Sequence, residues 1–122
     1  MGEMHKIIIT SVVKTGICVA SEDGSRLYKV LKHELSEGND IEISFKGVED
    51  LTSLFLNASI CQLYKDFSEQ QLKEHLSVTE IEPQDLDTLK RSVDRAKEYF
   101  KDPNRFHSVT EELLGPDDEQ HS

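Results

Sequence analysis

The chain has 122 residues, with 24 acidic and 14 basic side chains and a formal net charge of −10 at pH 7. This length suits one domain with a single hydrophobic core. Because the chain lacks the clustered basic residues of a nucleic-acid-binding surface, we expect neither DNA nor RNA to be its main partner.

The N-terminal third is predicted to contain two strands and a helix. Residues 6–13 (KIIITSVV) are mostly apolar and β-branched, which is typical of a strand covered on both faces. Residues 17–20 (ICVA) predict a second strand, and residues 14–16 (KTG) would join the two strands as a hairpin. Apolar residues at helical spacing then predict a helix over residues 21–37.

The middle of the chain combines a strand with an unusually apolar helix. Residues 40–46 (DIEISFK) alternate between apolar and polar side chains, which predicts a half-buried strand ending at Gly47. Residues 50–66 predict a helix that is apolar on more than one face, because residues 51–64 carry no charge. A helix of this kind is buried or covered by a partner, and it is too short to span a bilayer.

The last third is predicted to begin with a short helix, because residues 68–71 (SEQQ) have a capping-box pattern. This helix would end near residue 76, and residues 78–82 then give a weak strand pattern. Pro83 suits the first position of a helix, and residues 83–102 show the clearest amphipathic pattern in the chain.

This alternation of strands and helices predicts an α/β fold. We expect a mixed sheet of about four strands, covered by three main helices over residues 21–37, 50–66 and 83–102. Residues 1–103 would form the domain. Its core should include residues from each apolar stripe, namely Phe45, Phe55, Leu89, Val93 and Phe100.

The C-terminal segment over residues 104–122 is predicted to be an acidic tail that is mobile or loosely docked. Its last part, residues 110–122, holds five acids and no base. Its one small apolar group consists of Val109, Leu113 and Leu114. We expect the acidic end to contribute little to the folded core, because it has too few apolar residues to offset the entropy of ordering it.

Motifs for enzyme chemistry are not apparent. Cys18 and Cys61 lie in apolar settings and are predicted to be reduced core residues. The five histidines fall at no metal-ligand spacing, and no glycine-rich phosphate loop or nucleophile elbow is present. We therefore expect no enzyme activity, no metal and no cofactor. Without a signal-peptide pattern, the expected location is the cytoplasm, away from the membrane.

Thr52 and Ser53 stand where the strand-to-helix turn meets the apolar helix. Their simplest role is to cap the helix. Free backbone N–H groups at such a turn also favour an anion or a phosphate. A phosphate on either hydroxyl would add nearly two negative charges beside Glu49 and Asp50, which would make a repulsive switch at a binding surface.

The run from Ser25 to Phe67, and most specifically residues 52–64 (TSLFLNASICQLY), resembles the STAS-like domain family of bacterial and phage proteins. That family has a largely unassigned role and is similar to STAS domains, the anti-sigma-factor antagonists. The resemblance implies an α/β domain that binds a partner ATPase of the histidine-kinase-like fold. In the antagonists, phosphorylation of a Ser or Thr at the start of the corresponding helix breaks the complex.

The antagonists' Asp-Ser-Ser-Gly phrase falls, by position, on residues 51–54 (LTSL). The resemblance therefore keeps a pair of hydroxyls, at Thr52 and Ser53, as possible phosphoacceptors. The aspartate and the glycine of the phrase are replaced by Leu51 and Leu54.

Two functions remain open. The first is a protein-interaction and regulatory module, and the second is a small-ligand or nucleotide-binding sensor that uses the same helix N-terminus. Bare backbone N–H groups would favour the sensor, whereas an exposed apolar patch around Leu54 and Phe55 would favour the interaction module. Self-association is left open. The predicted partner-binding residues are Val48, Glu49, Asp50, Thr52, Ser53, Leu54 and Asn57.

Overall fold

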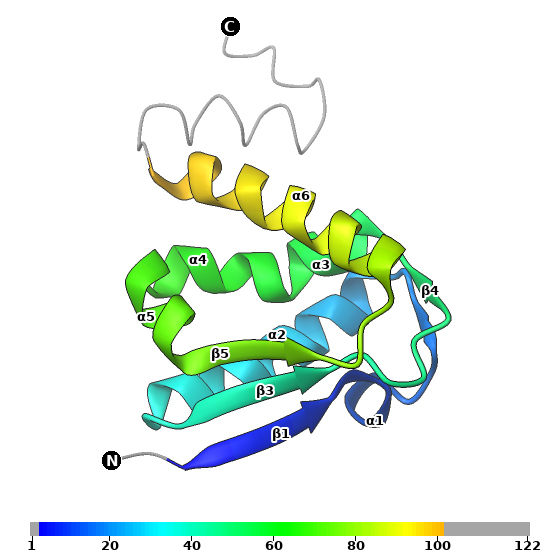
Figure 1. The fold of residues 1–122 in the computed structure, drawn as a ribbon, viewed down its shortest axis with the longest axis horizontal. Helices are drawn as coiled ribbons and strands as arrows, with labels where there is room; N and C mark the ends of the chain where they lie inside the picture. The colour runs from blue at the N-terminus through cyan, green and yellow to red at the C-terminus, as the bar shows by residue number, and fades with distance from the viewer. Residues whose placement is uncertain (1–2, 102–122) are drawn as a thin grey trace, which may run out of the picture.

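Three parallel strands form the main sheet of the computed structural model, which describes residues 3–101 (Figure 1). The strands are β1 (Met4–Ile8), β3 (Asp40–Ser44) and β5 (Leu76–Thr79), in the order β1-β3-β5. Ile7, Ile43 and Val78 lie in one register row across the sheet. Parallel neighbours need long crossover connections, and helices occupy those connections here.

A second, two-stranded parallel sheet joins β2 (Ile17–Cys18) to β4 (Asp50–Leu51). The α/β class is therefore confirmed, but the expected four-stranded mixed sheet is wrong, because the strands divide between two small parallel sheets. The expected hairpin between residues 6–13 and 17–20 is also wrong.

The hairpin is absent because the N-terminal apolar run changes from strand to helix part-way. Residues 9–13 form the short helix α1 (Ile9–Val13), which ends at Lys14 in the left-handed conformation (φ 67°). Ile9 and Val13 are four residues apart, so one helical face buries both of them. A run of β-branched residues fits this arrangement as well as it fits a strand.

The helices over residues 21–37 and 83–102 are confirmed as α2 (Ser21–Ser36) and, within the described range, α6 (Pro83–Lys101). The short helix α5 (Glu69–His75) is also confirmed. Its capping box has the Ser68 hydroxyl accepting from the Gln71 N–H and the Gln71 side chain accepting from the Ser68 N–H.

The helix expected over residues 50–66 is interrupted. Its first two residues belong to β4, and three short pieces follow: α3 (Ser53–Ala58), the 3₁₀ turn η1 (Ile60–Gln62) and α4 (Leu63–Asp66). The break falls at Ser59, whose backbone (φ −118°, ψ −95°) is not helical. The buried Ser59 hydroxyl donates to the Phe55 carbonyl at 2.8 Å, which satisfies it inside the core.

The core lies between the main sheet and the helices that pack on it. Phe45, Phe55 and Leu89 are buried as predicted, whereas Val93 and Phe100 are only partly buried and pack at its edge. Cys18 and Cys61 are free and buried as predicted. Burial raises the pKa of the Cys18 thiol to about 11 and that of the Cys61 thiol to about 12, so both thiols are protonated at neutral pH.

Within residues 3–101, no helix is long and apolar enough to cross a membrane. The boundary between residues 103 and 104, and the tail that follows it, lie outside the described residues.

At the end of the sheet where the strands begin, His5 joins β1 to α2. His5 Nδ1 lies 2.6 Å from Glu34 Oε1, which also accepts from Asn39 Nδ2 at 2.9 Å. The hydrogen bond to Glu34, followed by one to Glu3, raises the pKa of His5 above its ordinary 6.5. The bonds from Asn39 and then His5 lower the pKa of Glu34.

This contact makes stability depend on pH. A raised histidine pKa stabilises the fold fully below about pH 6.5, and the contribution is lost as pH rises through the folded-state pKa. The melting temperature should therefore fall more between about pH 6 and about pH 9 in the wild type than in His5→Gln. Parallel curves for the two proteins in a thermal denaturation series would contradict this expectation.

Candidate functional site

The predicted site residues lie where β4 passes beside β2 and enters α3. The Glu49 and Asp50 N–H groups both donate to the Gly16 carbonyl, at 2.8 and 3.2 Å, and the Thr52 N–H donates to the Cys18 carbonyl at 3.2 Å. A Cβ atom at Gly16 would lie 2.5 Å from the Gly47 carbonyl oxygen, so only glycine allows this close approach. The backbone of this segment is therefore fixed on β2.

Thr52 is the N-cap of α3. Its Oγ1 accepts from the Phe55 N–H at 3.2 Å and donates to the Val19 carbonyl at 3.3 Å. Its backbone is extended (φ −121°, ψ 159°) and its side chain is half-buried. The Thr52 hydroxyl is therefore engaged both as acceptor and as donor, which is a structural role.

Ser53 differs from its neighbour. It is the first residue of α3 and is exposed. None of the hydrogen bonds between residues 3 and 101 uses its hydroxyl. Glu49 and Asp50, just before it in the chain, are also exposed. The two hydroxyls look equivalent in the sequence, but in the structure only the Thr52 hydroxyl is hydrogen-bonded to described residues.

Two apolar side chains are exposed on the same elements. Leu54 is 57% exposed, and Ile17, the register partner of Asp50, is 41% exposed. Phe55, which we expected to share an exposed patch with Leu54, is completely buried. The exposure of Ile17 was not predicted, because a hairpin of residues 6–13 with residues 17–20 would give Ile17 a different partner strand from β4.

We call the set of exposed residues Ile17, Glu49, Asp50, Ser53 and Leu54 the corner. Two predicted site residues lie outside it. Val48 is half-buried and packs against the core. Asn57 is also half-buried and faces α6.

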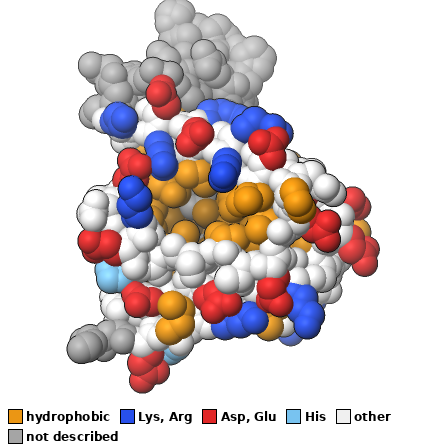
Figure 2. Space-filling model, in the orientation of Figure 1, with side chains coloured by type: hydrophobic (Ala, Val, Ile, Leu, Met, Phe, Trp, Pro, Cys, Tyr) orange, Lys and Arg blue, Asp and Glu red, His pale blue; other side chains and the backbone are white. Residues whose placement is uncertain are grey.

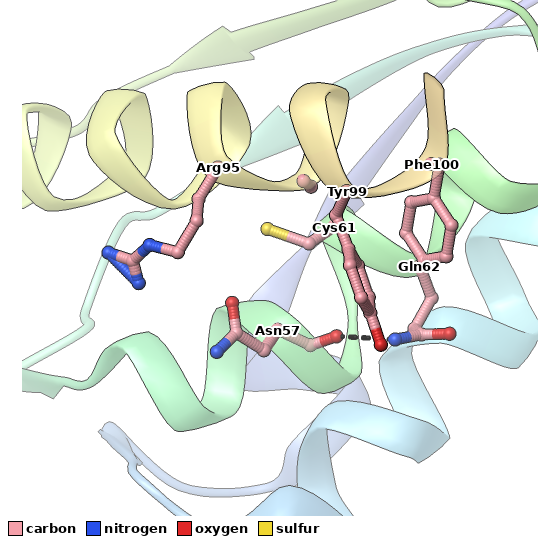
Figure 3. Close-up of a pocket in the computed structure, with 7 residues that line it drawn as sticks. Asn57, Cys61, Gln62, Arg95, Tyr99 and Phe100 are labelled. Carbon is pink, nitrogen blue, oxygen red and sulfur yellow. Dashed lines mark hydrogen bonds between the residues drawn. The ribbon is translucent and has the colours of Figure 1, made fainter. Parts of the chain in front are cut away.

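Asn57 lines a small pocket between η1 and α6 (Figure 3). Its backbone carbonyl accepts from Gln62 Nε2 at 2.9 Å, and Arg95 and Tyr99 come from α6 on the opposite side. The pocket holds about 30 Å³, which is room for a water molecule rather than for a metabolite. Burial rather than catalytic activation governs the nearby Cys61 thiol, because its pKa is raised.

Ligand-binding features at the corner are limited. α3 has only six residues, and the Thr52 side chain already caps it. Among residues 3–101, no group of three or more His, Cys, Asp or Glu side chains is placed to hold a metal ion. The geometry therefore offers an exposed surface with two acids, one hydroxyl and two apolar side chains.

A comparison with known protein families agrees with the parallel α/β architecture. Residues 23–86, which are 64 of the 122, match the model of a STAS-like domain of unknown function. The chain belongs to this STAS-like family. The match runs from the first turn of α2 to the start of α6 and so includes β4, Ser53 and Leu54. Searches of curated proteins and of solved structures found no match.

Proposed function

We propose that the chain is a non-enzymatic regulatory module that binds a protein partner through the corner. The observation that supports this most is the exposure of Leu54 beside the unengaged Ser53 hydroxyl, on a backbone that is hydrogen-bonded to Gly16 and Cys18. An exposed large apolar side chain next to polar groups is characteristic of an interface. The family's similarity to anti-sigma-factor antagonists suggests an ATPase of the histidine-kinase-like fold as the partner.

Ser53 is the phosphoacceptor in this proposal. A kinase needs a hydroxyl that it can reach, and Thr52 is half-buried and bonded at both ends. Phosphate on Ser53 would add nearly two negative charges close to Glu49 and Asp50. A partner that packs on the apolar Leu54 would have to strip water from the adjacent phosphate, and this desolvation cost would release the complex.

The alternative function, a small-ligand or nucleotide sensor at the same helix N-terminus, gains less support. Its distinguishing feature would be uncapped N–H groups, and Thr52 caps α3 instead. The pocket beside Asn57 is too small for a nucleotide.

The proposal predicts opposite behaviour for two replacements of Ser53. Ser53→Asp should weaken association with the partner by at least about 1–2 kcal/mol, or roughly 5- to 30-fold in Kd. Ser53→Ala should bind as the wild type does, because no residue in the described range 3–101 hydrogen-bonds to the hydroxyl. The partner would be captured from the native host with the tagged full chain, and the Kd values measured by isothermal titration calorimetry.

Two further variants serve as controls. Ser36→Asp adds the same charge at an exposed serine, the last residue of α2, which is not part of the corner. It should leave the Kd unchanged. Thr52→Ala should cost about 1 kcal/mol of folding stability through loss of the cap, with a smaller effect on binding. Equal Kd values for Ser53→Asp, Ser53→Ala and wild type would remove the corner from the mechanism. Phosphate on Ser53 would be sought by mass spectrometry of the protein from native cells.

A further inference from the structure

A second surface lies away from the corner, between β5 and α6. Figure 2 shows apolar side chains lining a hollow in this face, with charged side chains around its rim. The hollow is a groove of about 370 Å³. Its lining includes Leu76 and Val78 of β5, Val93 of α6 and Tyr64 of α4. β5 is an edge strand, because within the described residues only β3 pairs with it.

The groove continues toward the end of α6. A smaller hollow of about 190 Å³ shares Tyr64 and Lys97 with the groove and is also lined by Lys101. Lys101 is the last described residue, so the described part of the chain ends at this smaller hollow. An occupant that begins at Lys101 could follow it directly into the groove.

The charges of α6 favour an acidic occupant. Residues 90–101 carry five basic and two acidic side chains, although the whole chain has a net charge of −10. Two bases, Lys90 and Lys97, and one acid, Asp94, lie at the groove. Lys97 already pairs with Glu69 at 3.0 Å, whereas no ion pair between described residues uses Lys90. Lys90 is therefore free to pair with an incoming carboxylate.

The sequence after Lys101 has matching chemistry. Its apolar side chains, Phe106, Val109, Leu113 and Leu114, follow the spacing i, i+3, i+7, i+8 of one helical face, with Glu111 and Glu112 among them. We propose that residues 106–114 bind in the groove between β5 and α6 of the same chain. The mode is an amphipathic segment laid into an apolar groove.

The length of chain allows this. Leu89 and Lys101 are twelve helical steps apart in α6, which is about 18 Å at the helical rise per residue. Extended chain from Lys101 to Phe106 reaches up to about 17 Å, which is enough to reverse direction. A helical segment over residues 106–114 would then run about 12 Å back along the groove. Binding would cover Leu76, Val78 and the free edge of β5, which would otherwise be open to pairing with another strand.

The test uses the full chain. A change in residues 106–114 is detected at the groove, and a change at the groove is detected in residues 106–114. Replacing Leu113→Ser and Leu114→Ser together should shift the methyl NMR signals of Leu76, Val78 and Val93. The methyl signals of Leu27, which is buried on α2 and does not line the groove, should not move. Conversely, Lys90→Glu should lower the heteronuclear NOE of the amides in residues 106–114. The matched charge reversal Lys29→Glu, at an exposed position on α2, should leave those amides unchanged.

Ending the chain at Gly115 separates the proposed segment from the acidic end. This variant should keep the groove signals and a nearly unchanged melting temperature, because Pro116 is the one apolar residue in 116–122. Groove methyl signals that are identical in wild type and in the Leu113→Ser, Leu114→Ser variant would overturn the proposal. Groove shifts that grow with protein concentration, together with dimers in sedimentation, would assign the occupant to a second copy and overturn it too.

Discussion

Phe55→Ala should lower the free energy of unfolding by about 3–5 kcal/mol. Phe55 is completely buried and is among the largest fully buried side chains of the described residues. Its removal would lose both the hydrophobic transfer free energy and the packing around the cavity. Because a domain of this kind is stable by only about 5–15 kcal/mol, this one change would remove a large part of the total.

The neighbouring Leu54→Ala is the matched control for this prediction. Leu54 stands one residue earlier in α3 but is 57% exposed, so its truncation should change stability by no more than about 0.5 kcal/mol. Urea denaturation of both variants, followed by circular dichroism, gives the two values. A loss for Phe55→Ala that is within error of the loss for Leu54→Ala would mean that Phe55 belongs to the surface.

Gly24→Ala should also destabilise the fold, by about 1–3 kcal/mol. Gly24 is buried where α2 crosses α3, and an added Cβ would lie 2.6 Å from the Phe55 carbonyl oxygen and 2.8 Å from the Ala58 Cβ. The first of these contacts is with backbone, so the two helices must separate. Alanine gains about 1 kcal/mol in helix propensity over glycine, but this gain does not offset the overlap.

Ser25→Ala shows the effect of propensity alone, since Ser25 is the next residue of α2 and is exposed. This variant should be as stable as the wild type or slightly more stable. Opposite signs for the two alanine variants in the same denaturation assay would support the close crossing of α2 and α3. A stabilised Gly24→Ala protein would show that the helices do not approach as closely as described.

The elements that the sequence predicts well are those whose signals are local and repeated. α2 and α6 have long amphipathic patterns, and α5 has a capping box at Ser68 and Gln71. In α1 and α3, tertiary packing rather than a local sequence pattern decides the backbone conformation. Ile9 and Val13 suit a strand or a helical face equally, and Ser59 ends α3 with a hydroxyl bond to Phe55 that no periodicity indicates.

The candidate functional site was also predicted only in part. The sequence places both hydroxyls near the start of the apolar helix, but it misses β4, the strand that directly precedes them. It does not decide which hydroxyl caps α3, because a shift of one residue in the helix start exchanges their roles. The exposure of Ile17 depends on the pairing of β2 with β4, which are about 30 residues apart in the chain and share no local pattern.

The most direct test of the proposed function is a hydrogen-exchange footprint of the complex with the captured partner. The full chain would be compared free and bound, amide by amide. If the corner is the interface, partner binding should slow exchange between residues 48 and 57 and at Ile17, and Ser53→Asp should abolish this protection. Protection confined to other surfaces, such as the groove between β5 and α6, with none at the corner, would contradict the proposal.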